Sequence, residues 1–498
     1  MVDGMQAAGL RVVSTDPVWR FVVVEGRAAR MAGVFGVRLQ RHRHLRGHHR
    51  THDEPVHVPA ALHPLVTAVA GLDTIPLLRA ARTPATAPAA LVPLSDIARF
   101  YRFPPTTGTG QRIAILAFGG GFHESDVRQR GRSVGRPPAI RTIPVERARN
   151  RPMERRLLAR IVRALNSGAD MAALSRTFGR STVLSSLDTM ETTMDVELAA
   201  ALAPGASVDV YFAPGTKAGC LHALRRALGA RDRPTVVSMS WAAVEAWWGE
   251  NLLEAVDDML AHAADLQVSV CCASGDWGAQ GSEPDSDTLP DVAKVMFPAS
   301  SPYALACGGT RLERRGRAIR AETAWSGVSA GVRMATGGGV SGFFSRPDYQ
   351  RAAAVPRLRA ANGASWVSAV RGVRFRGRGV PDVSANAAAE TGYRVRIGGV
   401  ETSGDGTSAA APVWAALVAR LAEQQGRPIG QPHAWLYGEV AGLRAVLRGN
   451  NGTDSSTCPR VFDAGPGWNP CCGLGTPRGD RLAASLRAMT GGRRQGAG

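Results

Sequence analysis

Short apolar runs alternate with amphipathic stretches through the middle of this chain, and each run has the length of a buried strand. The runs are residues 112–118, 208–214, 235–241, 266–276 and 303–309. The stretches ETTMDVELAAALAP (191–204) and NLLEAVDDMLAHAAD (251–265) between them are typical of helices. Strands that alternate with helices predict an α/β fold with a doubly wound, mostly parallel sheet and helices on both faces. Functional residues are then expected in the loops at the carboxyl ends of the strands.

The N-terminal part of the chain has a different composition. Residues 1–88 contain seven of the eleven His, mostly in the stretch RLQRHRHLRGHHRTHDEPVH (38–57). A His cluster can bind a metal or respond to pH, but the pattern here favours a solvated basic loop. The following stretch, RAARTPATAPAALVPLSD (79–96), is rich in Pro, Ala and Thr and is typical of a linker.

The charge is strongly basic, with 60 Lys and Arg against 41 Asp and Glu. Only Lys217 and Lys294 are lysines, so the net charge of +19 comes from Arg spread along the chain. We interpret this as a solvated surface and expect no nucleic-acid partner. Residues 128–163 hold twelve Arg, but their apolar positions have helical spacing, which favours a surface helix.

Other sequence signals exclude several classes of protein. No apolar run approaches the roughly 18–20 residues of a membrane span, and the first residues lack the pattern of a secretory signal, so we expect no membrane partner. The seven Cys include no pair with zinc spacing. Cys271, Cys272 and Cys307 lie in strand-like runs and are expected to be buried. A disulfide between Cys458 and either Cys471 or Cys472 remains open.

The stretch SGDGTSAAAPVW (403–414) contains a candidate nucleophile. Gly406-Thr407-Ser408 precedes an apolar, helix-like segment, 409–421. A Ser at that junction lies where backbone N–H groups of a helix N-terminus can stabilise an oxyanion. Gly-Thr-Ser followed four residues later by Pro is also the nucleophile motif of subtilisin-like peptidases.

No histidine is evident as the base for this Ser. The candidates outside the N-terminal cluster are His123, His222, His262 and His433, and none has a His-Gly-Thr context. His222 and His262 lie within amphipathic helix patterns, where a structural role is expected.

Carboxylates are better placed than these imidazoles. Glu191 and Asp195 are four residues apart on a predicted helix, so they share one face, and their neighbours are largely apolar. Asp276, in CCASGDWG at the end of a strand, either caps the following turn or, when protonated, donates a hydrogen bond to an oxyanion. An enzyme with a carboxylate base is expected to prefer acid.

This set of residues resembles the sedolisin family of serine-carboxyl peptidases, and most closely its kumamolisin-like members. The matching stretches occur in family order from about residue 92 to 485: ETTMDVELAAALAPGASVDVYFAP, SMSW, ASGD, FPASSPYALACGGT, GGGVSGFF, GVPDVSAN, GDGTSAAAPVWAAL and AGPGWNPCCGLGTP. The resemblance implies a subtilisin-like fold and an endopeptidase that cleaves protein or peptide substrates. It also implies that Ser408 is the nucleophile, Glu191 the base, Asp195 its orienting partner and Asp276 the oxyanion donor.

The resemblance further implies a domain organisation. Residues 1–82 correspond to the later part of an N-terminal prodomain that inhibits the enzyme and is removed by self-cleavage, and 83–91 to a linker with the processing point. Residues 92–490 form the peptidase domain, with an Arg-rich insert at about 128–186 that we expect to decorate the surface. The family analogy also implies a monomer that is exported from the cell.

Two departures from the family pattern change this expectation. The family binds calcium near its C-terminus, but Ala445 and Asn469 stand where two Asp ligands are expected, leaving only the carbonyls of Val446, Gly465 and Gly467. Because calcium requires oxygen ligands and negative charge, we expect weak calcium binding or none. Ala117 stands where relatives often have Glu, which would change the acid profile. The competing hypothesis is an inactive homologue that serves as a binding or scaffold protein.

Overall fold

A central sheet of eight strands organises the computed structural model, which describes residues 1–44, 47–80, 91–133, 139–281, 294–316, 318–351, 359–360, 377–438, 442–453 and 460–495. The strand order is β14-β13-β11-β9-β6-β8-β7, and β20 also pairs with β13. All pairs are parallel except β13 with β14. The strands are β6 (Arg112–Ala117), β7 (Ala139–Pro144), β8 (Ser207–Phe212), β9 (Val236–Met239), β11 (Ser269–Ala273), β13 (Leu305–Arg315), β14 (Ala318–Ala324) and β20 (Val383–Asn386). The predicted doubly wound, mostly parallel α/β fold is confirmed.

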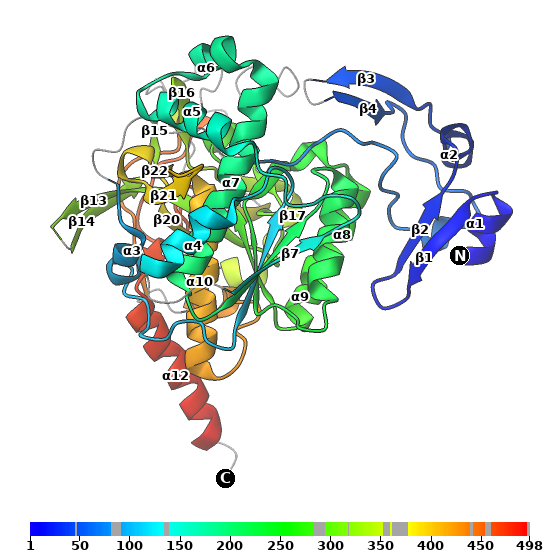
Figure 1. Cartoon of the computed structure of the whole chain (residues 1–498). Coiled ribbons are helices and arrows are strands. Elements are labelled where there is room, and N and C mark those ends of the chain that lie inside the picture. The colour runs from blue at the N-terminus through cyan, green and yellow to red at the C-terminus, as the bar shows by residue number, and fades with distance from the viewer. Residues whose placement is uncertain are drawn as a thin grey trace.

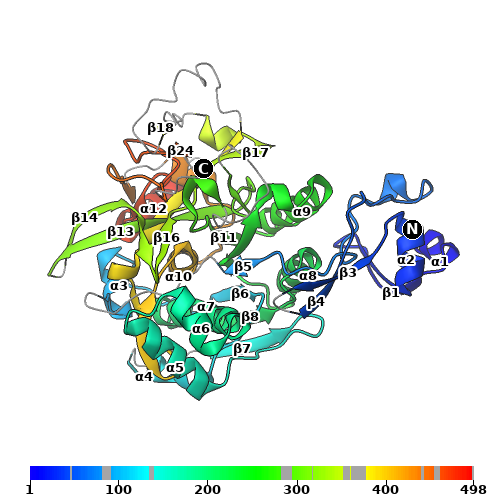
Figure 2. The same cartoon turned by 90° about the horizontal axis from the view of Figure 1, so that it is seen from above.

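Helices cover both faces of this sheet because side chains alternate along each strand. In β6, Ile113 and Ile115 pack in one core and Ala114 and Leu116 in the other. The first core contains α3 (Leu94–Phe100), α7 (Arg180–Leu202), α10 (Thr407–Gln425) and α12 (Gly479–Gln495), and the second contains α8 (Lys217–Leu228) and α9 (Glu250–Asp265). Figures 1 and 2 show α7 and α10 on one side of the sheet and α8 and α9 on the other.

The Arg-rich insert is part of the sheet and its core, so the expectation of surface decoration was wrong. Its strand β7 pairs with β8 along six residues, and Arg141 forms a two-pronged ion pair with the buried Asp209 of β8 at 2.8 and 2.7 Å. Its helices α5 (Arg155–Asn166) and α6 (Met171–Phe178) bury Leu158, Ile161 and Leu174 against α7. The surface helix predicted from the helical spacing within residues 128–163 is confirmed as α5, with Arg on its outer face.

Smaller pairs of strands and further helices surround the sheet. They are β10 (Trp241–Val244) with β12 (Met296–Phe297), β15 (Ser326–Ser329) with β16 (Val332–Ala335), β17 (Gly339–Ser345) with β19 (Gly377–Val380), β18 (Arg359–Ala360) with β24 (Arg460–Val461), β21 (Tyr393–Ile397) with β22 (Val400–Gly404), β23 (Leu443–Arg444) with β25 (Thr476–Pro477), and the helices α4 (Glu124–Ser133) and α11 (His433–Gly438). None of the helices in the described part of the chain has the length and apolar character needed to cross a bilayer.

The N-terminal lobe, residues 1–78, has a small core of its own. It contains α1 (Val2–Ala7), β1 (Arg11–Asp16), β2 (Phe21–Glu25), α2 (Ala28–Phe35), β3 (Gln40–His44) and β4 (Gly47–Thr51). Met5, Leu10, Phe35 and Leu62 are buried together. The His-rich stretch forms the antiparallel β3–β4 hairpin, so the predicted loop was wrong. Among the described residues, no three His, Cys, Asp or Glu side chains form a group that could hold a metal ion.

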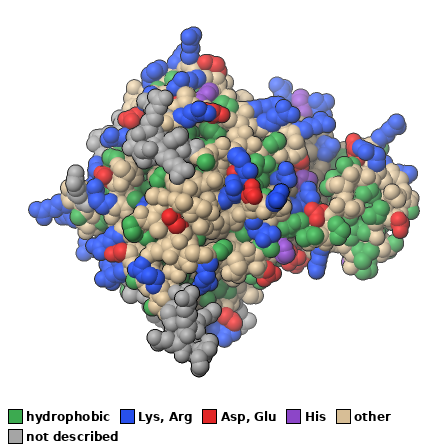
Figure 3. Space-filling view, turned by 60° about the horizontal axis from the view of Figure 1, so that its bottom comes forward, with side chains coloured by type: hydrophobic (Ala, Val, Ile, Leu, Met, Phe, Trp, Pro, Cys, Tyr) green, Lys and Arg blue, Asp and Glu red, His purple; other side chains and the backbone are tan. Residues whose placement is uncertain are grey.

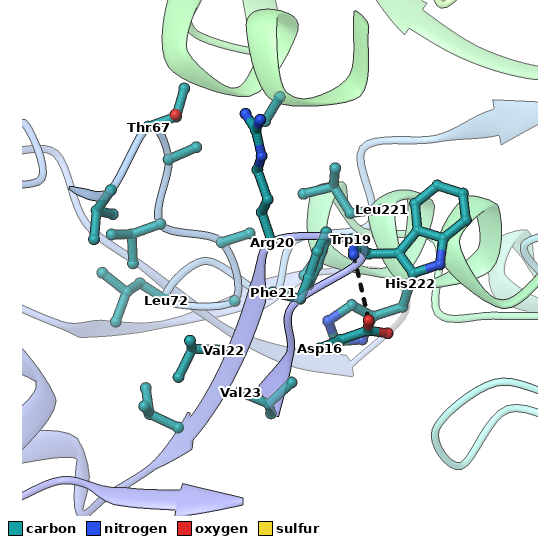
Figure 4. A pocket seen from close by; sticks show the side chains of 18 of the residues that line it. Asp16, Trp19, Arg20, Phe21, Val22, Val23, Thr67, Leu72, Leu221 and His222 are labelled. Atoms are coloured by element: carbon teal, nitrogen blue, oxygen red, sulfur yellow. Dashed lines mark hydrogen bonds between the residues drawn. The ribbon is translucent and has the colours of Figure 1, made fainter. Parts of the chain in front are cut away.

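The lobe contacts the outer side of α8 and α9 beside a groove. Asp16 forms an ion pair with Arg225 at 2.9 Å, and the Arg225 guanidinium lies over the Phe21 ring. The Trp19 ring meets His262 edge to face, with ring centroids 4.7 Å apart. Figure 4 shows the groove between β2 and α8, with His222 directed toward the Trp19–Phe21 turn.

The surface in Figure 3 carries both basic and acidic side chains. Basic side chains are spread over the face in Figure 3 with acidic ones among them, while hydrophobic side chains gather on the N-terminal lobe at the right. That the protein has no nucleic-acid partner stays a prediction.

Cys271, Cys272 and Cys307 are buried as expected. Cys471 and Cys472 are free thiols, and Cys458 lies outside the described residues.

Candidate active site

Two carboxylates enter the core from α7. Glu191 and Asp195 are 0% and 1% exposed, although both are acidic. The helix is buried on several sides because it lies between α10, the outer helices α4 and α6, and the β21–β22 hairpin. A carboxylate in such surroundings is costly unless polar groups meet it. Its burial here is therefore an indication of a functional site.

Ser240 connects Asp195 to the predicted nucleophile. It lies between β9 and β10, and its Oγ is 2.7 Å from Oδ1 of Asp195 and 3.0 Å from the carbonyl oxygen of Ser408. In the other direction, the Ser408 hydroxyl donates to the carbonyl of Ser240 at 3.4 Å. The carboxyl end of β9, helix α7 and the start of α10 thus meet at one point. The α/β fold class predicted functional residues at the carboxyl ends of the strands.

Pro412 explains why the Ser408 carbonyl accepts this bond. In a regular helix the N–H four residues later would bind that carbonyl, but Pro has no N–H. The carbonyl at the start of α10 is therefore available to the Ser240 hydroxyl. The Pro of the sequence motif thus has a local physical role.

Asp276 lies on another side of the nucleophile, just beyond β11. Its Oδ1 accepts hydrogen bonds from the N–H and the hydroxyl of Thr407 at 2.8 and 2.7 Å. Its Oδ2 is buried and has no hydrogen-bond partner among the described residues. Burial raises the pKa of Asp276 well above its ordinary value, the Thr407 bonds oppose this, and the charges of Glu191 and Asp405 raise it further. Oδ2 is therefore the oxygen that can carry a proton and donate it in a hydrogen bond.

The structure places the histidines away from this point. His123 contacts the carbonyl of Met153, His222 contacts Glu146, and His433 contacts the carbonyl of Ala304. His262 packs against Trp19. The expected structural roles of His222 and His262 agree with these contacts.

Sequence reasoning missed three contributors to the site: Ser240, Thr407 and Asp405. Thr407 directly precedes Ser408 and Asp405 lies three residues before it, so their position in the motif was a signal. Ser240 lies in the stretch SMSW, which was noted only as part of the family resemblance. Asp405 is 3% exposed and acts on Asp276 through its charge.

The residues of the expected calcium site are brought together only in part. The carbonyls of Val446 and Gly465 converge on the side chain of Asn469. Gly467 has a φ of +75° in the same loop, and no contact of its carbonyl with Asn469 is seen. Ala445 supplies a methyl group where a carboxylate was expected.

Comparison with known proteins places this geometry in a family. The model of the subtilase family matches residues 193–462, which include Asp195, Asp276 and Ser408. Kumamolisin of Bacillus sp. (strain MN-32) is 38% identical over 500 residues, spanning 97% of this chain and 81% of kumamolisin. The chain belongs to the sedolisin family. It is therefore a serine-type peptidase by class.

Other members of the sedolisin family agree with this assignment. Sedolisin of Pseudomonas sp. (strain 101) is 32% identical over 263 residues, which cover 51% of this chain and 40% of that protein. The solved structure of Pseudomonas sedolisin, a serine-carboxyl proteinase complexed with two molecules of pseudo-iodotyrostatin, superimposes with a TM-score of 0.62 at 24% identity. That match covers 82% of this chain and 99% of the sedolisin chain, and it shows the subtilisin-like fold.

Proposed function

We propose that this sedolisin-family chain is an acid-acting endopeptidase in which Ser408 attacks the peptide carbonyl and Glu191 is the general base. Asp195 orients the base, and Asp276 donates a hydrogen bond to the oxyanion. The observation that carries the proposal is the meeting of Asp195, Ser240 and Ser408 in one hydrogen-bonded group. Asp276 is joined to the same helix start through Thr407.

The proposed reaction follows from these positions. Glu191 removes the proton of the Ser408 hydroxyl as its Oγ bonds to the carbonyl carbon of the substrate, and the carbonyl oxygen becomes negative. Protonated Oδ2 of Asp276 and the Ser408 N–H, in the first turn of α10, stabilise that oxygen. The proton held by Glu191 then passes to the leaving amine, and water repeats the sequence to release the acyl group. A carboxylate base works best near its ordinary pKa of about 4, so activity is expected in acid.

The segment after the N-terminal lobe supports a further part of the proposal, inhibition by the chain's own prodomain. Strand β5 (Arg79–Ala80) pairs antiparallel with Trp241 and Ala242 of β10, directly after Ser240. It also lies close to α7. An extended segment on this strand occupies a place where a substrate backbone could add to the sheet. Ser408 is 0% exposed in this arrangement.

The test of the proposed function is an acid incubation of the full chain at roughly pH 3–5 beside Ser408→Ala. We expect the parent chain to cleave itself within residues 83–91 and to digest a denatured protein, while Ser408→Ala does neither. Mass spectrometry identifies the cut sites in both. A folded parent chain that cuts nothing over this pH range would reject the proposal in favour of the inactive homologue.

Ser240→Ala is expected to lower kcat by about 10–100-fold with little change in KM, because a hydrogen bond to a carboxylate is worth about 1.5–3 kcal/mol. The measurement is kcat and KM on a fluorogenic peptide across acid pH. Ser238→Ala is the matched control. Ser238 is buried in β9, the strand that ends directly before Ser240, and its hydroxyl has no partner among the described residues. Equal losses in both variants would argue against a role for the Ser240 hydroxyl.

A further inference from the structure

The side chain of Asn469 lies at the centre of the C-terminal loop, 1% exposed. Its amide nitrogen Nδ2 is 3.1 Å from the carbonyl oxygen of Gly465, 3.4 Å from that of Gly473 and 3.5 Å from that of Val446. Three backbone oxygens from different parts of the loop therefore converge on one donor group. Two of them, those of Val446 and Gly465, belong to residues expected to bind calcium.

The other end of the same amide is equally well partnered. Oδ1 of Asn469 accepts hydrogen bonds from the N–H groups of Cys471 and Cys472 at 3.2 and 3.0 Å. The backbones of Asn469 and Gly473 also exchange two hydrogen bonds, at 3.1 and 2.8 Å. Because carbonyls lie on one side and N–H groups on the other, only one orientation of the amide directs its two N–H bonds toward the three carbonyls and its oxygen toward the N–H groups.

These residues do not fit a calcium ion. Calcium takes six to eight oxygen ligands at roughly 2.3–2.6 Å, with carboxylates to offset its charge. Here a nitrogen that carries hydrogens lies between the carbonyls, and Ala445 contributes no oxygen from its side chain. Between residues 442 and 475, the acid in the described part of the chain is Asp463, and one carboxylate offsets only half of the ion's double charge.

We propose that the carboxamide of Asn469 replaces the calcium ion and closes the C-terminal loop without any metal. A carboxamide presents partly positive hydrogens to the converging carbonyls, which is the interaction that an ion would otherwise supply. Its oxygen also binds two N–H groups, which a cation cannot do. The loop is thus held by a neutral side chain that is part of the chain itself.

This closure lies near the candidate active site. The carbonyl of Cys471, whose N–H is held by Asn469, accepts a hydrogen bond from the hydroxyl of Thr336 at 3.0 Å. The neighbours of Thr336 bind the backbone that carries Asp276: the N–H of Ala335 donates to the carbonyl of Asp276, and the N–H of Gly337 to that of Gly275. The Asn469 side chain is therefore three contacts from the proposed oxyanion donor.

The experiment compares thermal unfolding in EDTA and in about 5 mM CaCl₂ at about pH 7, where carboxylates are ionised. All proteins are full chains that carry Ser408→Ala, so that self-cleavage cannot interfere and the result does not depend on the proposed activity. The parent is compared with Asn469→Asp and with Ala445→Asp/Asn469→Asp. Asn451→Asp is the matched control, because Asn451 is a buried loop Asn that binds one carbonyl.

We expect calcium to leave the unfolding midpoint of the parent within about 1 °C. Asn469→Asp should unfold several degrees lower in EDTA, since a carboxylate then faces three carbonyls, and calcium should restore part of the loss. The double variant should respond more strongly, and Asn451→Asp should not respond. A parent midpoint that rises by several degrees with calcium, or an Asn469→Asp variant as stable as the parent in EDTA, would overturn the proposal.

Titration calorimetry of the parent with CaCl₂ keeps the test decisive when the Asp variants do not fold. Saturable binding by the parent at about 1 mM calcium or below would contradict a closed carboxamide site. No heat above that of dilution, with a folded and cooperative parent, is the expected result.

Discussion

Replacing Glu191 by Gln is expected to lower kcat by about 10⁴–10⁶-fold, the range of losses seen when one member of a catalytic triad is removed. Gln has nearly the shape of Glu, but it cannot accept the proton of the Ser408 hydroxyl. Since base and nucleophile act as a unit, Glu191→Gln combined with Ser408→Ala should be no worse than Ser408→Ala alone. The measurement is single-turnover cleavage of a fluorogenic peptide over the acid range.

Glu197→Gln is the control for this loss. Glu197 lies on the same helix, is 0% exposed and accepts a hydrogen bond from the N–H of Arg396 at 2.9 Å. The substitution therefore repeats the change of charge in the same buried helix, away from Ser408. We expect kcat of Glu197→Gln to stay within about 10-fold of the parent. If Glu191→Gln kept more than about a tenth of parental activity, Glu191 would not be the base.

Asp276→Ala is expected to lower kcat by about 10²–10³-fold with little effect on KM, the range found when one oxyanion donor is removed. Asp276→Asn should keep most of the activity, because its oxygen can still accept from Thr407 and its NH₂ takes the place of the protonated Oδ2. The amide does not ionise, so the upper pH limit set by Asp276 should disappear in the Asn variant. Parallel pH profiles of kcat for the three proteins test this. An Asn variant as impaired as Ala would contradict a neutral donor at this position.

The raised pKa of Asp276 also predicts how the free energy of unfolding changes with pH. The pKa of Asp276 is raised in the folded chain, chiefly by burial, so above its ordinary pKa of about 4 the unfolded chain releases a proton that the folded chain keeps. The contribution of this group to the free energy of unfolding is therefore complete below about pH 4 and is lost as pH rises. Denaturant unfolding of Ser408→Ala, with and without Asp276→Asn, should show a smaller decline toward neutral pH in the Asn variant.

Much of the candidate site could be predicted from the sequence because its residues stand in strong local patterns. The four-residue spacing of Glu191 and Asp195 fixes them on one face of a helix, and the Gly-Thr-Ser turn fixes Ser408 at the start of another. Ser240 could not be found this way. Its role depends on α7 and α10 meeting at the end of β9, a contact between segments 45 and 168 residues away in sequence.

The two wrong predictions about the fold concern strands that are rich in charged or polar residues and therefore lack the apolar pattern of a strand. In β7 the side chain of Arg141 counted as surface charge, yet it pairs with the buried Asp209 of the neighbouring strand. In the N-terminal lobe, β3 reads QRHRH and β4 reads GHHRT, so neither strand has an apolar face and the hairpin has no hydrophobic period to recognise. Pairing partners that lie outside a segment cannot be read from the segment itself.

The proposed Asn469 closure has a consequence for the proposed acid-acting peptidase. A calcium site made of carboxylates weakens as pH falls, since protons compete with the ion for the same oxygens. A carboxamide has no proton to gain in this range, and its partners are backbone groups that do not titrate. On this proposal, the C-terminal loop and the Thr336 contacts that lead to Asp276 depend neither on acidity nor on the supply of metal. The loop is then held by a side chain of the protein itself, whereas a calcium ion in the same place would be released in acid.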